Sequence, residues 1–150
     1  MGTTNFDAVA AAFTGALTGN VTGNVTGNVT GQVTYPATVA RTATADGTGT
    51  GTIAAAGLLQ FVTVTSDDAN KIIVLPTPTP GTIVILRNGA TGYELRSSAP
   101  ATIAINGGAG ADAESAVAAS TMVIAVCTSA TTWQAIGLAG TTLAAVEAAA

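Results

Sequence analysis

The chain contains no histidine and only one cysteine among its 150 residues. Without histidine it lacks the commonest general base, the Ser-His-Asp and Cys-His catalytic arrangements, and the usual zinc ligand. A single cysteine allows no disulfide within the chain. We therefore expect no enzymatic activity, no cofactor and no metal centre. Cys127 lies in the apolar run Met122–Cys127, so we expect it to be a small buried residue.

Charge is equally scarce, because only 8% of the residues are charged and the net charge is −4. The four basic residues, Arg41, Lys71, Arg87 and Arg96, form no cluster that would neutralise phosphates or a membrane surface. No apolar run reaches the roughly 20 residues that span a bilayer, and the N-terminus lacks the basic start of a signal peptide. We expect a soluble protein that is not secreted and that binds neither nucleic acid nor membrane.

Bulky side chains are also few, because aromatic residues make up 4% of the chain. Hydrophobic residues reach 48%, and most of them are alanine or valine. Such a chain buries only a thin core by itself, and small domains with thin cores are commonly stabilised by oligomerisation.

What the sequence does have is a repeat of four residues near its N-terminus. Apolar residues recur there at Leu17, Val21, Val25, Val29 and Val33. A glycine follows each of the first four two places later, which disfavours a helix by about 1 kcal/mol per glycine. In extended chain this period puts all the valines on one face. That stripe is too thin to cover a globular core, but it suits identical chains wound about a common axis. We therefore predict that residues 1–34 form an N-terminal arm and an oligomeric stalk.

Other interpretations of the repeat are a disordered polar tether, a glycosylated segment or a phosphate-binding loop. A polar, glycine-rich composition is typical of flexible linkers. The Asn-Val-Thr sequons at Asn20, Asn24 and Asn28 would be modified only in a secreted chain. A phosphate loop would need a Gly-Lys-Ser/Thr sequence and a preceding strand, and the repeat has neither. The tether is the main alternative to the stalk.

The rest of the chain predicts an all-β fold, a small antiparallel sandwich or barrel-like module. We expect an extended linker at 35–57, the module at 58–138 and a C-terminal tail, loose or helical, at 139–150. Within the module, Trp133, Cys127 and Ile85 are expected in the core. Short β-branched runs separated by turn residues predict strands at Gln60–Thr65, Lys71–Leu75, Thr82–Asn88, Tyr93–Ser97, Thr102–Ile105, Met122–Thr128 and Thr132–Ile136.

Three groups of polar residues are candidates for chemistry. Asp67 and Asp68 precede Lys71, where charges most simply solvate a turn. Residues 107–112 read Gly-Gly-Ala-Gly-Ala-Asp, the pattern of calcium-binding β-rolls, but those rolls stack several copies and this chain has one. A glycine-rich hairpin loop is the simpler interpretation, with calcium at a subunit contact as the alternative. Glu94 and Arg96 should share one strand face, in a solvated or intersubunit salt bridge.

The two halves together resemble structural proteins of tailed-bacteriophage virions. The Val-Thr-Gly-Asn repeat is similar to the trimeric stalks of phage fibre and decoration proteins. The succession Lys71–Pro76, Gly81–Asn88, Thr102–Gly108 and Ser129–Trp133 resembles the β-domains of capsid decoration (cement) and head-fibre proteins. The resemblance covers about 100 residues and implies a non-catalytic homotrimer. Its partner would be the major capsid protein, whose outer surface it would bind and stabilise.

This resemblance also implies a location on the capsid surface of the virion, after assembly in the host cytoplasm. The alternative function is a short tail-fibre or host-adhesion protein with a carbohydrate-binding β-domain. That function would need an exposed cluster of aromatic and acidic residues, for which the chain offers only Tyr35, Tyr93 and Trp133.

Overall fold

The computed structural model describes residues 38–140, 142–144 and 146–150, which all belong to one compact unit, Thr34–Ala150. This part of the chain is nearly all β, with one short 3-10 helix, η1 (Gly49–Gly51), and no α-helix. Its strands are β1 (Val39–Thr42), β2 (Leu59–Thr65), β3 (Ile72–Val74), β4 (Ile83–Asn88), β5 (Tyr93–Arg96), β6 (Ala104–Ile105), β7 (Ser115–Val117), β8 (Thr121–Ser129), β9 (Thr132–Ala139) and β10 (Thr142–Ala144).

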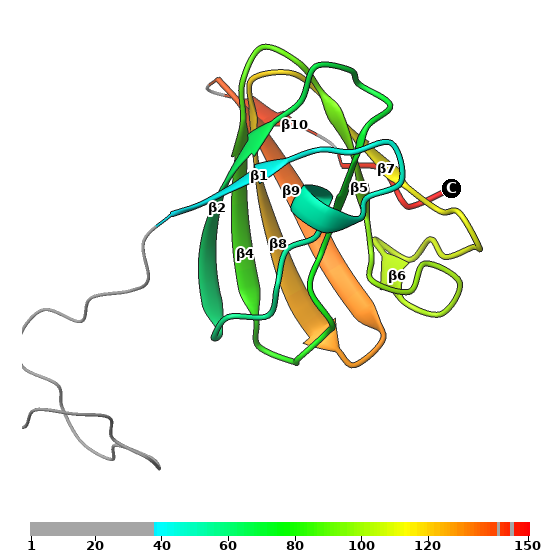
Figure 1. Ribbon diagram of the computed structural model, residues 1–150. Helices are drawn as coiled ribbons and strands as arrows, with labels where there is room; N and C mark the ends of the chain where they lie inside the picture. The colour runs from blue at the N-terminus through cyan, green and yellow to red at the C-terminus, as the bar shows by residue number, and fades with distance from the viewer. Residues whose placement is uncertain (1–37, 141, 145) are drawn as a thin grey trace, which may run out of the picture. The chain divides into compact units, whose positions relative to one another are not determined.

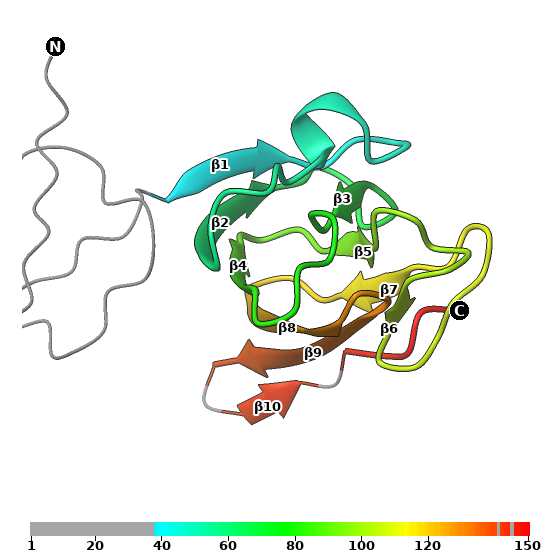
Figure 2. The ribbon, with the colours of Figure 1, turned by 90° about the horizontal axis from the view of Figure 1, so that it is seen from below.

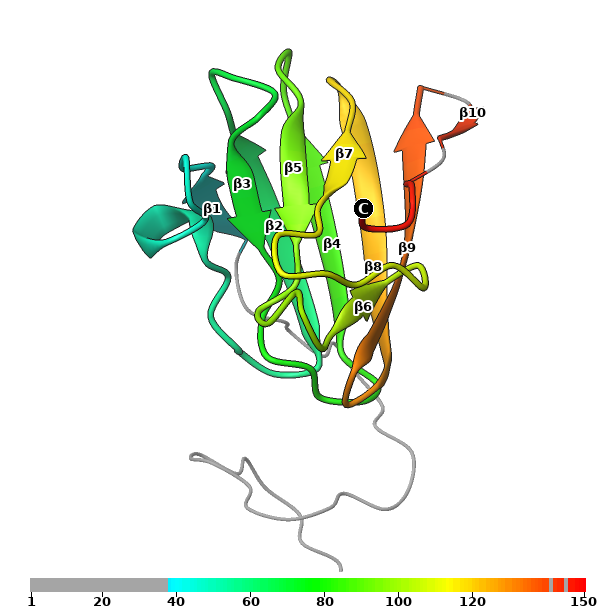
Figure 3. The same cartoon turned by 90° about the vertical axis from the view of Figure 1, so that its right-hand side faces the viewer.

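The described strands form two sheets that face each other (Figures 1 and 2). The large sheet has seven strands in the order β1-β2-β4-β8-β9-β10, with β6 also paired to β9. The small sheet has three strands in the order β3-β5-β7 and lies in front of the large one in Figure 3. Side chains between two packed sheets form the hydrophobic core, so the core of this domain lies between the large sheet and the small sheet.

From β1 to β5 the chain winds like a solenoid, because it alternates between the two sheets. Val39 pairs in parallel with Val62, and Leu59 pairs in parallel with Ile83, 23 and 24 residues further along the chain. In the small sheet Thr52 bridges to Val74 and Ile72 pairs with Glu94, each 22 residues apart. Each coil therefore takes 22 to 24 residues. Beyond β5 the chain reverses, and β7, β8, β9 and β10 complete the sheets through antiparallel pairings.

The prediction of an all-β fold is confirmed for the described residues, whereas the antiparallel arrangement is not, because the sheets are mixed. Parallel pairing joins β1 to β2, β2 to β4, β3 to β5 and β6 to β9. Parallel neighbours need a long crossover connection, and here the intervening strand in the other sheet provides it. Short strands with turns between them look alike in both arrangements, so the strand spacing could not distinguish the two.

The expected linker 35–57 is part of the folded domain from residue 38 onward, which corrects that prediction. β1 pairs with β2, and Ala43 and Ile53 are each 2% exposed. The backbone N–H of Ile53 donates to the carbonyl of Val74 at 2.9 Å, just as that of Leu75 donates to Arg96 at 2.8 Å in the next coil. Few large residues mark this first coil in the sequence, which is why it resembled a linker.

The expected C-terminal tail is also part of the domain and contains no helix among its described residues. β10 pairs with β9, and Val146 and Ala149 are buried. The N–H of Ala149 donates to the carbonyl of Ile105 at 3.1 Å. A side chain at Gly108 would collide with the backbone of Ala149, so the closing segment requires glycine at that position. The tail therefore closes one side of the core.

All seven predicted strands are present, with boundaries that differ by a few residues; β1, β7 and β10 were not predicted. β7 is missing from the prediction because its residues, Ser115–Val117, have little bulk. The predicted N-terminal arm and stalk, residues 1–34, lie outside the described residues.

Candidate functional site

The outer face of the large sheet is the most distinctive surface of the described domain, because apolar side chains occupy it where solvent-facing strands normally carry polar ones. Strand β8 illustrates this. Val123, Ala125 and Cys127 point into the core, and the alternate residues, which point outward, are also apolar as far as Val126. We call this surface the exposed apolar face and define it by outward residues of β2, β4, β8 and β9: Leu59, Phe61, Ile83, Ile85, Met122, Ile124, Val126, Ile136 and Leu138.

These residues are in register across the strands, so they form continuous rows. Phe61 lies opposite Ile85, Ile85 opposite Ile124, and Ile124 opposite Ile136, which makes an unbroken apolar row across four strands. On one side of it runs a second row, Leu59, Ile83, Val126 and Gln134. Cross-strand neighbours of this kind stand about 4.5–5.5 Å apart at Cβ, close enough to form one surface.

Two side chains of the face are exposed, and the other seven are partly buried. Phe61 is 37% exposed and Ile136 is 44% exposed. Solvated side chains of this size are normal when they are scattered singly, but a contiguous group of them marks a contact surface.

A shallow groove lies on this face where the chain enters the described domain. Phe61, Thr63, Ile85, Arg87 and Met122 line it, together with Thr38, the first described residue, and Val62. Arg87 carries the only charge among the described outward residues of β2, β4, β8 and β9. The groove is thus apolar with a single cation at one end.

The outer face of the small sheet differs, because β5 places charged groups on it beside the apolar Ile72 and Val74 of β3. Arg96 forms an ion pair with Glu114, and its guanidinium lies 3.9 Å from Asp112. Glu94 shares this face, and burial, together with the negative charge of Glu114, raises the pKa of its carboxyl. Arg96 thus forms its salt bridge with Glu114, the residue directly before β7, and not with Glu94.

Of the three residues expected in the module core, Trp133 and Cys127 lie there and Ile85 does not. Trp133 is 0% exposed and Cys127 is 1% exposed. Burial raises the pKa of the Cys127 thiol, as expected for an unreactive cysteine. Ile85 alternates with the buried Val84 and Leu86, so it belongs to the exposed apolar face. The β-strand period of two explains the error, since neighbouring apolar residues cannot all point inward.

The five residues predicted for the oligomeric stalk lie outside the described residues, so the structure leaves this prediction untested. They are Leu17, Val21, Val25, Val29 and Val33.

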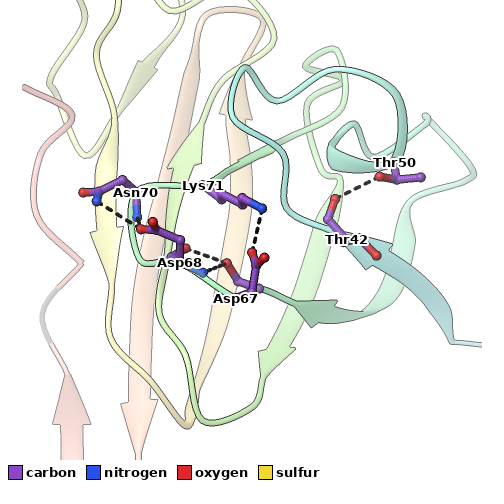
Figure 4. Close-up of polar contacts among 7 residues, drawn as sticks. Thr42, Thr50, Asp67, Asp68, Asn70 and Lys71 are labelled. Atoms are coloured by element: carbon purple, nitrogen blue, oxygen red, sulfur yellow. Dashed lines mark hydrogen bonds and ion pairs between the residues drawn. The ribbon is translucent and has the colours of Figure 1, made fainter.

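The acidic pair after β2 belongs to a turn, as Figure 4 shows. Lys71 Nζ lies 2.7 Å from a carboxylate oxygen of Asp67, and this neighbour lowers the pKa of Asp67. Asp68 Oδ1 accepts hydrogen bonds from the backbone and side-chain nitrogens of Asn70 at 2.9 and 3.0 Å. In the same view the hydroxyl of Thr50 donates to the carbonyl of Thr42 at the end of β1. The contacts of Asp67 and Asp68 stabilise the turn, and both carboxylates bind residues of that same turn.

The glycine-rich segment 107–112 forms a loop between β6 and β7. Asn106 and Gly107 have positive φ angles of 52° and 91°. The Asn106 side chain donates to the carbonyls of Ala135 and Val146 at 2.9 and 2.7 Å and accepts from the N–H of Ala135 at 2.8 Å. The loop thus links β9 to the C-terminal segment. Among the described residues no group of three or more Cys, Asp or Glu side chains is arranged to hold a metal ion.

Sequence reasoning did not identify the exposed apolar face, although the runs Ile83–Leu86 and Met122–Cys127 carried a signal of it. Uninterrupted apolar runs are typical of strands covered on both faces, and only one of these faces is covered within the described domain. No helix in the described part of the chain is long and apolar enough to cross a membrane.

Comparisons with family models, with curated proteins and with solved structures gave no match to this chain.

Proposed function

We propose that the protein is a structural virion component, a homotrimer that binds the outer surface of a tailed-phage capsid and stabilises it as a cement (decoration) or head-fibre protein. The resemblance of the repeat and of the β-domain motifs supports this class. The observation that carries the oligomeric part of the proposal is the exposed apolar face, because a contiguous apolar surface of this kind is typical of contacts between macromolecules.

In this proposal residues 1–34 form the trimeric stalk or arm, and the two-sheet domain from Thr38 onward is the globular part. The protein acts without catalysis and without a cofactor. Its partners are the major capsid protein and two further copies of itself, and neither nucleic acid nor membrane is among them. Each copy adds weak contacts with the capsid, and linkage of three copies multiplies their effect on affinity.

The protein would be assembled in the host cytoplasm and located on the capsid surface. There it would strap neighbouring capsid subunits together against the pressure of the packaged DNA. The low charge of the chain favours contacts made by backbone and aliphatic surfaces, which salt weakens little.

The alternative, a carbohydrate-binding adhesion protein, receives little support from the positions of the aromatic residues. Tyr93 is 1% exposed and Trp133 is 0% exposed, so neither offers a ring to a sugar. Tyr35 lies outside the described residues. Among the described aromatic residues, Phe61 alone is exposed, and its direct partner on β4 is the aliphatic Ile85.

The test is to co-express the chain with the major capsid protein encoded in the same genome and to sediment the assembled shells. The proposal predicts that the chain sediments with the shells in a fixed ratio and raises the temperature at which they fall apart. Shells that sediment without the chain would contradict the capsid-binding function.

The stalk is tested by replacing Val21, Val25 and Val29 together with aspartate, which would bury charge along the shared axis. The proposal predicts that this variant forms trimers less readily than the wild type. A variant that assembles like the wild type would exclude the wound stalk and leave the polar tether.

A further inference from the structure

We propose that the exposed apolar face is the surface through which copies of this chain contact one another in the trimer. The inference rests on the proposed function for the number of copies, and the face itself supplies the rest. A second copy of the chain is the occupant that the composition of the face and its position beside the chain entry favour.

The composition of the face suits a partner that is itself uncharged. Four strands contribute large aliphatic or aromatic side chains in register, and the row from Phe61 to Ile136 has no polar member. Contact cores between proteins are depleted in charge, because each buried and unpaired charge opposes association. The same face on another copy meets this requirement, since none of its residues is charged and Arg87 lies beside it at one end.

The place where the chain enters the domain points to the same partner. Thr38 lines the groove on this face. Val33, the last residue of the predicted stalk, precedes Thr38 by five residues, which span at most about 18 Å when fully extended. Copies that are joined through this segment, as in the proposed stalk, would meet one another at a high effective concentration.

The size of the face indicates that the stalk and the face would both contribute to the stability of the trimer. Four strands about 4.8 Å apart and five residues at about 3.3 Å each cover roughly 300 Å² in plan. A stable interface buries about 800 Å² on each partner. The face alone is too small for a stable trimer, and so is a single stripe of valines. Stalk and face are therefore expected to act together, and loss of either should weaken the trimer without abolishing it.

The experiment measures the mass of the full-length chain by sedimentation equilibrium over a range of concentrations. The first variant is Ile136→Lys, in the middle row of the face, and the second is Phe61→Lys, at the opposite end of that row. Both positions are already exposed, so the domain should fold. The control is Ala116→Lys on β7, which adds the same charge to the exposed outer face of the small sheet, opposite Glu94.

We expect each face variant to raise the concentration at which half of the chains are trimeric by about thirtyfold or more, the effect of losing an interface anchor. The control should leave that concentration unchanged. Circular dichroism verifies that each variant is folded; if one variant unfolds, the other still decides the outcome. Trimers as stable as the wild type in both folded face variants would overturn the inference.

Failure of the inference is distinguishable from failure of the proposed function. If the triple aspartate variant of the stalk dissociates while the face variants remain trimeric, the stalk stands and the face inference is wrong. If the face variants remain trimeric but no longer sediment with shells, the face contacts the capsid protein and the inference is again wrong. A wild-type chain that is monomeric at all concentrations would contradict both.

Discussion

The outer faces of the two sheets differ in chemistry although they belong to the same small domain. The large sheet presents rows of aliphatic residues and a single cation, Arg87, whereas the small sheet presents the charged Glu94 and Arg96 beside the apolar Ile72 and Val74. Only 8% of the residues are charged, so their distribution is informative. In a domain with solvent on both sides, charged residues on both outer faces would favour solubility. The difference supports the proposal that other copies of the chain cover the large sheet.

The strands themselves show the same difference. In β8 both faces are apolar, and in β5 the buried Tyr93 and Leu95 alternate with the charged Glu94 and Arg96. An alternating strand needs one partner layer, while a strand that is apolar on both faces needs two. The second layer over β8 is absent from the described domain, and further copies of the chain are its proposed source.

The largest expected effect comes from the interior that separates the two faces. Trp133→Ala would remove the largest fully buried side chain and should lower the free energy of unfolding by about 3–5 kcal/mol. Thermal unfolding of the folded variant measures the loss. The control is a folded variant of the exposed apolar face, such as Ile136→Lys, measured as a dissociated chain. If its free energy of unfolding fell as much as that of Trp133→Ala, the division into interior and outer face would be wrong.

A smaller effect is expected at Asn88, which joins the end of β4 to the segment before β8. Its side-chain amide donates to the carbonyls of Thr91 and Ala118 at 2.9 and 3.0 Å, and its oxygen accepts from the N–H of Thr121 at 2.9 Å. Asn88→Ala leaves these buried groups unpaired and should cost about 1–3 kcal/mol. Urea unfolding measures the change; an unaltered midpoint would show that water replaces the amide.

The charged face makes a prediction that depends on pH. Glu94 has a raised pKa in the folded chain, because burial and the charge of Glu114 disfavour its carboxylate. Its ionisation therefore destabilises the fold as pH rises from its ordinary pKa of 4.5 through the raised value. Glu94→Gln should unfold at a higher temperature than the wild type at pH 7, and this difference should disappear at pH 3.

Equal melting temperatures of Glu94→Gln and the wild type at pH 7 would show that Glu94 is solvated like any surface carboxylate. The variant Glu94→Asp keeps the negative charge at the same position and serves as the control. It should not reproduce the stabilisation.

The smallest effect is expected at the turn after β2, where the ion pair of Asp67 with Lys71 is exposed to solvent. Exposed pairs of this kind contribute little to stability. Asp67→Asn should leave the melting temperature unchanged within error in 1 M salt, where screening already weakens the pair. A clear loss of stability at high salt would mean that the turn organises the adjoining coil.

Much of the strand pattern was predictable, because β-branched runs and turn residues mark β2, β4, β8 and β9 clearly. The parallel coils were not, since the direction of pairing depends on contacts between residues more than 20 positions apart, such as Leu59 with Ile83. β1 and β10 escaped prediction because alanine and threonine give them little apolar signal.

The candidate site was predictable only in part. Trp133 and Cys127 follow from their size and their apolar surroundings, whereas the position of Ile85 depends on the register of β4 in the finished sheet. Apolar residues adjacent in sequence show that a strand has two apolar faces. They do not show which face lies inside, and this is the information that the two-layer fold provides.

The most direct test of the central claim is the native mass of the full-length chain by light scattering at micromolar concentration. The account predicts three times the chain mass of 14.4 kDa, with little change when the salt concentration is raised to 1 M. A mass of 14.4 kDa under these conditions would contradict it, because the exposed apolar face would then remain uncovered in solution.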